Sequence, residues 1–367
     1  MAIFKKSQYY DNARLLAENA TYAMAIGERS NGKTYSFLKY MLKRYINNDE
    51  KCAIIRRWED DFRGKRGANM WAGLVSNDEV KTMTGGEWTG IYYYSGMWYL
   101  SRQDDKGNRI KQEDPFCYAF ALSTMEHDKS TSYDINNVFF DEFIPVGGQY
   151  LRDEFIVFQN VLSTIIRQRD DVKIFMAANT ISKSCIYFSE MGLDGVTKMK
   201  PGDIQVYKYG ESGLTVAVEF TDTPAKKKPS DKYFAFNNPK LSMITGKGSP
   251  WQIGIYPHKP EDFLPKDIVF TYFIVFERNI LQCEIVETNT GTYTYIHRKT
   301  TPLKNPERDL IYTPDYDPRP NYRRKITKAT DKIDRRVQSF FVSDKVFYQD
   351  NDTGETVQNY LRWCAQN

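Results

Sequence analysis

Apolar positions in the first half of the chain alternate between short continuous runs and stretches with helical spacing. The short runs predict strands, and they cover residues 21–26, 52–58, 116–122, 137–143 and 173–179. Two longer stretches, over residues 33–47 and 155–166, carry one apolar face each and predict helices. Residues 91–100 predict an aromatic hairpin that turns at Ser95-Gly96. This alternation is typical of an α/β fold with helices on both faces of a parallel sheet.

The pattern changes after about residue 200. Residues 201–213 are rich in turn formers, and residues 223–232 predict an exposed basic turn or linker. Beyond residue 241, consecutive strands are predicted over 268–277, 281–287 and 292–298, and helical spacing returns over 357–365. We therefore expect a first domain over residues 1–205, a linker over 206–240, and a smaller α+β domain over 241–367.

Composition narrows the class of protein. The 367 residues are 41% hydrophobic, enough for a folded core, and the net charge of +4 does not by itself announce a nucleic-acid binder. The five cysteines are widely spaced, which indicates reduced thiols in an intracellular protein. With only three scattered histidines, a His/Cys metal site is not expected. We expect a cytoplasmic protein without a signal peptide, since no apolar run approaches the roughly 18 residues of a membrane span.

Residues 27–34, GERSNGKT, fit the phosphate-loop (Walker A) pattern G-x-x-x-x-G-K-[ST]. Gly27 and Gly32 would let backbone N–H groups approach phosphate oxygens, Lys33 would reach the β- and γ-phosphates, and Thr34 would offer its hydroxyl to Mg²⁺. A strand precedes the loop and a helix follows it, as the motif requires. The pattern predicts ATP and Mg²⁺ as cofactors; the alternative is an ordinary glycine-rich turn.

The strand over residues 137–143 ends in adjacent acids. Asp141 is the candidate (Walker B) ligand for Mg²⁺ and its waters, and Glu142 is the candidate to polarise an attacking water. An adjacent pair of this kind favours hydrolysis over nucleotide sensing. The alternative is a strand that ends in two solvated acids.

Two further polar positions follow. Arg167 and Arg169 end the next helix, where a cation either complements the helix dipole or serves as an arginine finger on a neighbouring subunit's nucleotide. Asn179 ends the next strand, where it either contacts the γ-phosphate or the lytic water or terminates the strand in a turn.

Basic residues gather in three segments that could bind DNA or RNA phosphates. The strongest has seven positive charges in 14 residues: Arg323, Arg324, Lys325, Lys328, Lys332, Arg335 and Arg336. The others are Lys226–Lys228 and the loop that carries Arg63, Lys65 and Arg66. For each segment the alternative is a solvated, solubilising surface.

Four stretches together resemble a known family. In order and spacing, GERSNGKTYS, AIIRRWEDD, VFFDEFI and STIIRQRDDVKIFMAANTIS are similar to the phi-twenty-nine-like bacteriophage DNA-packaging ATPases. Those proteins are ring motors that push genomic DNA into an empty procapsid. The resemblance continues more weakly through residues 273–297 and 345–365.

For the nucleotide site, the resemblance implies one role per residue. Lys33 and Thr34 match the family's phosphate-loop lysine and hydroxyl, and Arg29 matches a basic residue inside that loop. Asp141 and Glu142 match the Walker B acid and the catalytic glutamate.

For the remaining positions, the resemblance favours Arg167 over Arg169 as the trans-acting finger. Lys129 matches a second trans-acting basic residue, across a one-residue difference in length. Asn179 matches a residue that couples hydrolysis to movement, and Arg56 matches a basic residue after the second strand. Glu59 departs from the family, which has a basic residue there.

The resemblance implies an additional-strand P-loop ATPase domain, a small linker, and a ribonuclease-H-like domain that has lost its nuclease acids. The first long strand of that domain, 268–276, has no internal Asp or Glu, so we expect no nuclease activity. It also implies a homomeric ring, of five subunits in the family, that acts in the host cytoplasm on the procapsid. The expected partners are double-stranded DNA, the portal and a packaging RNA. Two alternatives stay open: a large terminase with an active nuclease, and a non-motor nucleic-acid-binding scaffold with a vestigial P-loop.

Overall fold

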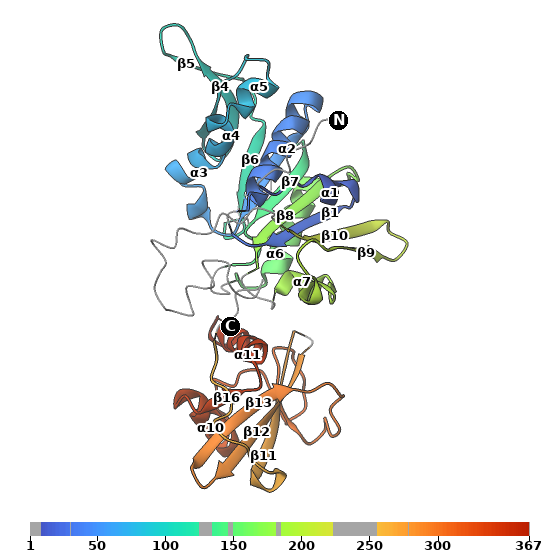
Figure 1. Ribbon diagram of the computed structural model, residues 1–367, viewed down its shortest axis with the longest axis vertical. Coiled ribbons are helices and arrows are strands. Elements are labelled where there is room, and N and C mark those ends of the chain that lie inside the picture. Colours follow the sequence, from blue (N-terminus) through green and yellow to red (C-terminus); the bar gives the residue numbers. More distant parts are fainter. Residues whose placement is uncertain are drawn as a thin grey trace, which may run out of the picture. The chain divides into compact units, whose positions relative to one another are not determined.

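Two compact units make up the chain, each built around its own β-sheet (Figure 1). The computed structural model describes residues 9–29, 31–124, 134–145, 150–180, 185–222, 255–277 and 279–366. The first unit comprises residues 1–145, 153–180 and 193–250, and the second comprises residues 146–152, 181–192 and 251–367.

The first unit holds a large, mostly parallel sheet, as the strand–helix alternation predicts. Along the sheet the strands run β3-β4-β6-β2-β7-β8-β1-β10-β9, and β5 pairs with β4. The bounds of these strands are β1 (Tyr22–Gly27), β2 (Lys51–Arg56), β3 (Gly90–Tyr94), β4 (Met97–Gln103), β5 (Arg109–Lys111), β6 (Cys117–Ala121), β7 (Ile135–Asp141), β8 (Lys173–Asn179), β9 (Ile204–Tyr209) and β10 (Leu214–Phe220). The six central strands, β6, β2, β7, β8, β1 and β10, are parallel to one another. Strands β3, β4, β5 and β9 are antiparallel additions at the two edges.

Helices cover both faces of this sheet. The ring of Phe139 in β7 lies 5.3 Å from that of Phe37 in α2 (Lys33–Asn48), and the ring of Phe140 lies 5.1 Å from that of Phe158 in α6 (Glu154–Ile166). Consecutive side chains of a strand point to opposite faces, so α2 and α6 pack on opposite sides of β7. Shorter helices complete the first unit: α1 (Ala13–Ala17), α3 (Lys65–Asn69), α4 (Ala72–Ser76) and α5 (Glu79–Met83), with one-turn 3₁₀ helices over Glu59–Asp61 and Val196–Lys198. Helix α7 (Ile186–Glu190) lies in a segment of the second unit.

The first sheet extends beyond residue 205, where we placed the end of the first domain. Strand β10 pairs in parallel with β1 over residues 216–220, and β9 pairs with β10. The boundary predicted at 205 is therefore too early, because β9 and β10 belong to the same sheet as the phosphate loop. The basic turn at Lys226–Lys228 lies outside the described residues, so the linker to residue 240 and the domain over 241–367 stay predictions.

The second unit contains a six-stranded sheet among its described residues, in the order β15-β14-β11-β12-β13-β16. Its strands are β11 (Ile268–Phe276), β12 (Asn279–Thr288), β13 (Gly291–Arg298), β14 (Leu310–Tyr312), β15 (Tyr322–Arg323) and β16 (Val346–Tyr348). Strands β11, β12 and β13 form an antiparallel meander, and β14 and β16 pair in parallel with its two outer strands. A 3₁₀ turn precedes the sheet at Pro265–Asp267.

Two helices close the core of the second unit. Helix α10 (Lys332–Val342) contributes Val337 and Phe340, and α11 (Asn351–Gln366) contributes Tyr360, to the cluster built on the sheet. Within the described part of the chain, neither these helices nor any other has the length and apolar character needed to cross a bilayer.

Candidate nucleotide-binding site

Parallel pairing brings the carboxyl ends of neighbouring strands to one edge of the first sheet. Gly27 at the end of β1 lies opposite Asn179 at the end of β8, and Asp141 at the end of β7 lies opposite Ala177. Arg56 follows Ile55, which pairs with Phe140, so it lies next to Asp141. Ligands of open α/β sheets bind at this edge, and four of the predicted positions meet there.

The loop after β1 has its two glycines where only glycine fits. A Cβ on Gly27 would lie 1.9 Å from the Thr221 hydroxyl oxygen, so any side chain there would displace that residue. Gly32 has φ = 95°, a backbone conformation that L-residues with a Cβ rarely adopt, and it leads directly into α2. The glycines predicted to cradle a phosphate are therefore also required by the loop's own geometry.

The ammonium group of Lys33 is buried and turned into the loop. It donates to the carbonyl oxygens of Gly27 (3.2 Å) and Glu28 (2.7 Å), and to the side-chain oxygens of Asn31 (3.1 Å) and Asn179 (3.3 Å). Burial lowers the pKa of Lys33 to about 7, against a smaller opposing effect of Asp141 and Glu28. The Lys33 ammonium thus lies among four oxygens of the protein, and the phosphate oxygens of a bound nucleotide would take their place.

Thr34 and Asp141 form the second half of the site. The Thr34 hydroxyl lies 3.0 Å and 3.2 Å from the two carboxylate oxygens of Asp141. Burial raises the pKa of this carboxyl, and the nearby Arg56 guanidinium works in the opposite direction. A hydroxyl and a carboxylate at this spacing are hard oxygen donors of the kind that Mg²⁺ takes beside a nucleotide, so the residues fit that ion.

Arg56 neutralises both acids of the predicted pair. Its guanidinium lies 2.6 Å from Asp141 and 2.8 Å from Glu142, and the side chain is largely buried. Glu142 itself has φ = 60° and an exposed side chain, because the chain turns sharply at the end of β7. The site therefore carries a positive charge in contact with both carboxylates, at a residue that only the family resemblance singled out.

The sequence analysis missed the residue next to Arg56. Arg57 is buried and makes a bidentate ion pair with Glu154 at the start of α6, both bonds at 2.7 Å. It also donates to the backbone oxygens of Glu142 (3.2 Å) and Phe143 (2.9 Å). Arg57 therefore fixes the backbone that carries the acid pair. Its role depends on the packing of β2 against α6, which a local sequence pattern does not reveal.

The sequence analysis gives no role to Asn31 of the loop, yet its side chain is buried and hydrogen-bonded at both its nitrogen and its oxygen. Its amide nitrogen donates to Thr221 (2.7 Å), and its oxygen accepts from the backbone N–H (3.4 Å) and the ammonium of Lys33. Thr221 follows β10 and donates its own N–H to Ile26. The loop is therefore held by a strand that we had assigned to the linker.

The structure separates the two arginines at the end of α6. Arg169 bonds the carbonyl oxygens of Ile135 and Ile165 and lies 3.4 Å from Asp134, whereas Arg167 is exposed. Ile135 begins β7 and Asp141 ends it, so the strand separates them by roughly 20 Å at 3.3 Å per residue. The end of α6, which Arg169 holds against Ile135, therefore lies at the opposite end of β7 from the candidate site. Arg167 and the phosphate loop are not brought together within one chain.

Two further residues were predicted for the nucleotide site, Arg29 and Lys129. Arg29 is exposed on the loop. Lys129 lies outside the described residues, so its trans-acting role stays a prediction.

The loop before α3 is less free than its sequence indicates. Arg63 lies 3.0 Å from Asp60, and Arg66 donates to the backbone oxygen of that same residue. Both arginines and Lys65 are exposed, so all three can reach a phosphate, but two of them already have local partners.

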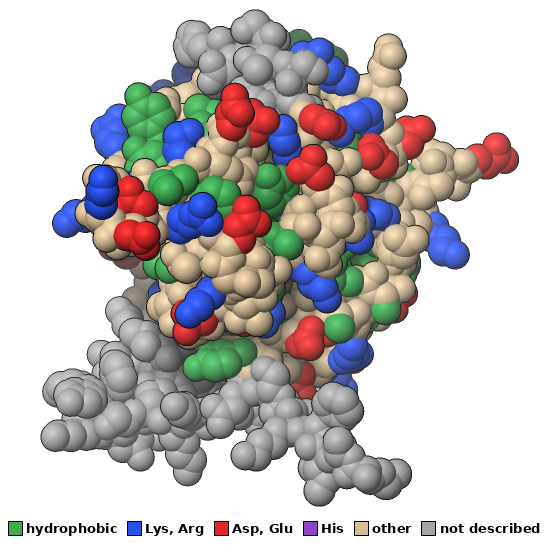
Figure 2. All heavy atoms as spheres, turned by 90° about the horizontal axis from the view of Figure 1, so that it is seen from above, with side chains coloured by type: hydrophobic (Ala, Val, Ile, Leu, Met, Phe, Trp, Pro, Cys, Tyr) green, Lys and Arg blue, Asp and Glu red, His purple; other side chains and the backbone are tan. Residues whose placement is uncertain are grey.

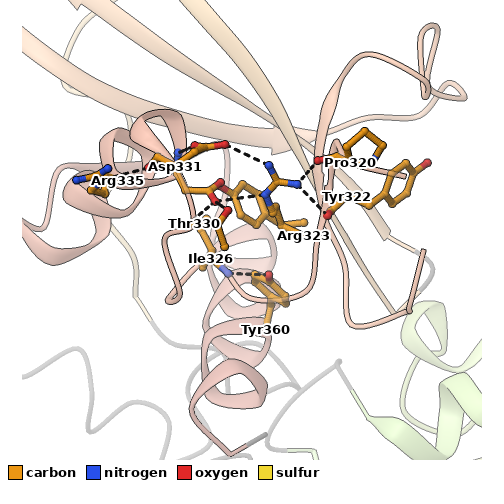
Figure 3. Close-up of polar contacts among 10 residues, drawn as sticks. Pro320, Tyr322, Arg323, Ile326, Thr330, Asp331, Arg335 and Tyr360 are labelled. Carbon is orange, nitrogen blue, oxygen red and sulfur yellow. Dashed lines mark hydrogen bonds and ion pairs between the residues drawn. The ribbon is translucent and has the colours of Figure 1, made fainter. Parts of the chain in front are cut away.

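The strongest basic segment divides into one internal arginine and a set of exposed residues. Arg323 lies 3.1 Å from Asp331 and 3.3 Å from the buried Asp334, and it also donates to the backbone oxygens of Pro320 and Tyr322 (Figure 3). The structure assigns Arg323 to the packing of β15 against α10, in place of the nucleic-acid contact that we predicted. Arg324, Lys328, Lys332, Arg335 and Arg336 are exposed, and Lys325 is half-buried.

The family model of the Podovirus DNA encapsidation protein (Gp16) matches residues 4–83 and 104–206, about half of the chain. The chain belongs to this family. Curated relatives include the DNA packaging proteins of Bacillus phages phi29 and PZA, each 24% identical over 187 residues. That alignment covers 50% of this chain, and the chain spans about half the length of these relatives.

Two solved structures extend the likeness to the whole chain. The bacteriophage Phi-29 viral genome packaging motor assembly aligns with a TM-score of 0.58 at 17% identity, covering 97% of this chain and 99% of the other. The Phi-28 gp11 DNA packaging motor aligns with a TM-score of 0.55 at 17% identity, covering 97% and 98%. At this identity the likeness concerns the fold, and it extends beyond residue 206, where the match of the family model ends.

The buried pair of Arg57 and Glu154 yields a stability prediction. We expect Arg57→Met or Glu154→Leu alone to lower the free energy of unfolding of the first unit by about 3–5 kcal/mol, because each leaves a buried charge without its partner. The double variant should lose much less than the sum. Urea titration with hydrogen exchange read at α6 measures both, and additive losses would contradict the pairing. Arg63→Met, which removes the exposed pair with Asp60, is the matched control and should change stability little.

Arg323 and Arg336 should behave differently when neutralised. Arg323→Gln removes a charged partner of the buried Asp334, so we expect a loss of about 1.5–3 kcal/mol in the second unit. Arg336→Gln changes an exposed side chain and should leave stability unchanged. Hydrogen exchange of the α10 amides in the full chain reports the difference, and equal protection in both variants would refute the internal role of Arg323.

Proposed function

We propose that this protein hydrolyses ATP with Mg²⁺ and uses the energy to translocate double-stranded DNA into a viral procapsid. One observation carries the proposal: the Lys33 ammonium lies 3.3 Å from Asn179 while the neighbouring Thr34 hydroxyl lies 3.0 Å from Asp141. The phosphate-binding, metal-binding and candidate coupling residues thus come from three strand ends and meet at one edge of the sheet. The printed names of the relatives, DNA packaging proteins of Bacillus phages, support the same direction.

In this proposal the loop binds the phosphates of ATP. Backbone N–H groups at the start of α2 attract the phosphate oxygens, and Lys33 exchanges its loop oxygens for those of the nucleotide. Thr34 and Asp141 would hold Mg²⁺, which would neutralise charge that develops during phosphoryl transfer. Glu142, exposed at the end of β7, orients the attacking water, and Arg56 offsets the charge of both acids.

Hydrolysis is completed from a neighbouring subunit. Because Arg167 lies at the far edge of the sheet from its own phosphate loop, an arginine finger at this position can act only on another chain's nucleotide. This geometry supports a homomeric ring, of five subunits as in the family, with Arg167 and Lys129 acting in trans. Asn179 touches Lys33 and is the residue proposed to couple the state of the γ-phosphate to movement.

The second unit is proposed to be the ribonuclease-H-like, nuclease-dead domain. An antiparallel meander whose first strand pairs in parallel with a later strand supports this fold. Likewise, β8 between the phosphate-loop strand β1 and the acid strand β7 supports an additional-strand ATPase. The exposed cations of residues 324–336 and of the loop at 63–66 are proposed to contact DNA or RNA phosphates. The portal and a packaging RNA complete the partners, at the procapsid in the host cytoplasm.

Lys33→Ala and Glu142→Gln test the proposed chemistry. We expect each to abolish ATP turnover, Lys33→Ala by weakening nucleotide binding and Glu142→Gln with binding retained, because a neutral amide cannot orient and deprotonate water equally well. ATP turnover with and without duplex DNA, together with nucleotide affinity, measures this. Normal turnover in either variant would reject the assignment. Cleavage of the added DNA would favour a terminase with an active nuclease, and DNA binding without turnover in the unaltered chain would favour a scaffold.

Arg167→Ala and Arg169→Ala separate a trans role from a structural one. Arg167→Ala should leave ATP affinity within about two-fold and lower turnover in assemblies by about 10³-fold or more. Arg169→Ala should instead loosen the contact between α6 and β7, seen as faster hydrogen exchange at residues 134–136. Adding catalytically dead Glu142→Gln subunits, which still carry Arg167, should partly restore turnover of Arg167→Ala subunits. Loss of ATP binding in isolated Arg167→Ala subunits would contradict action in trans.

A further inference from the structure

A three-stranded extension of the first sheet has no role in the site described above. Strands β3, β4 and β5 form it, and residues 84–103, which contain β3 and β4, fall in the gap of the family model. Strand β3 turns tightly into β4 at Ser95 and Gly96, both with positive φ. The family model therefore leaves β3 and β4 unmatched, whereas β5 lies within its matched residues.

One face of the extension belongs to the protein core. Trp98 and Leu100 of β4 are buried in the main hydrophobic cluster, and Tyr93 of β3 packs against it. Because side chains alternate along a strand, Tyr92 and Tyr94 point to the opposite, outer face. Cross-strand pairing places Tyr99 opposite Tyr92 on the same side of the sheet, but Tyr99 is buried, so Tyr92 and Tyr94 supply the rings of this face.

The same outer face receives two cations from β5. Arg109 pairs with Gln103, and Lys111 pairs with Ser101, two residues along β4 from Tyr99. The Arg109 guanidinium lies 4.6 Å from the centre of the Tyr92 ring, and the Lys111 ammonium lies 4.0 Å from that of Tyr99. Within the described part of the chain, no ion pair to a carboxylate is found for either cation.

The rings themselves form a flat stack. Tyr92 and Tyr94 are nearly parallel, at 9°, with ring centres 6.4 Å apart, and Tyr94 is 61% exposed. The Arg109 guanidinium, which lies over the Tyr92 ring, is a planar group that can also stack on a base. The outer face thus presents one exposed ring and one exposed guanidinium side by side, both suited to stack on a planar aromatic group.

We propose that this face, formed by Tyr92, Tyr94, Arg109 and Lys111, binds single-stranded nucleic acid. Bases stack on aromatic and guanidinium planes, while their phosphates meet the two cations. A duplex hides its base faces inside the helix, so the stacking groups would gain nothing from it. The face is accordingly distinct from a surface that grips duplex DNA through phosphates alone.

Acidic and basic side chains are mixed around the extension, so electrostatic attraction should supply only a small part of its affinity for nucleic acid. Figure 2 looks down on the end of the first unit where β4 and β5 lie, and shows acidic and basic side chains interspersed among apolar ones, with no large area of one sign. Asp105 and Glu113 flank β5 and are exposed. Stacking should therefore dominate, and binding should depend on salt less steeply than duplex binding by basic segments does.

The test is fluorescence anisotropy of the full chain with labelled 12-nucleotide DNA and RNA strands of one sequence, and with the matching duplex. We expect both single strands to bind, and Tyr94→Leu to weaken them at least about five-fold. Arg109→Gln should also weaken them. Tyr316→Leu, at a tyrosine 80% exposed in the second unit, is the matched control and should change nothing.

Three outcomes would overturn the proposal: unchanged single-strand affinity in Tyr94→Leu, an equal loss of duplex affinity in that variant, or a change only in self-association. Duplex-stimulated ATP turnover, measured on the same variants, should stay normal, because none of these residues lies at the phosphate loop. This separates the proposal from the proposed function: loss of turnover in Lys33→Ala bears on the motor, and loss of single-strand binding in Tyr94→Leu bears on the extension.

Discussion

The register of the parallel strands is the constraint on which the candidate nucleotide site depends. Gly27 pairs with Asn179, and Asp141 pairs with Ala177, two residues before Asn179, so that loop, acid and amide all arrive at the carboxyl end of the sheet. A slip of one residue in β7 would exchange the faces of Phe140 and Asp141. It would turn a carboxylate towards an apolar face and remove the acid from Thr34. The aromatic packing of β7 against helices on both sides therefore fixes the chemistry as well as the core.

Three cations at the candidate site, two buried and one largely buried, are each compensated by oxygens. Lys33 is surrounded by four oxygens, Arg56 by two carboxylates, and Arg57 by a carboxylate and two backbone oxygens. A buried charge without such partners is costly. In the proposed function, the phosphate oxygens of a nucleotide would take the place of the oxygens around Lys33.

Local patterns predict the parts of this structure that local forces decide. The glycine loop, the acids at the end of β7 and the hairpin at Ser95-Gly96 follow from motif, burial and turn chemistry. Strands β9 and β10 were placed outside the first domain because nothing in their own sequence shows that β10 completes the sheet beside β1. Arg323 looked like one more charge in a basic segment, since its partners, Asp331 and Asp334, are brought to it only when α10 packs. Long-range pairing, which a single sequence does not display, accounts for both errors.

Cations that are neighbours in sequence have different fates, for a geometric reason. Arg56 and Arg57 leave the end of β2 in opposite directions, so one meets the acids of the site while the other meets Glu154 at the start of α6. Arg167 and Arg169 are divided by the end of α6, where Arg167 has φ = 52° and the chain turns. One arginine folds back onto β7 and the other stays at the surface. A count of charge along the sequence does not distinguish the members of these pairs. The direction of the backbone at the end of each element does, because it decides which side chain packs inside the fold.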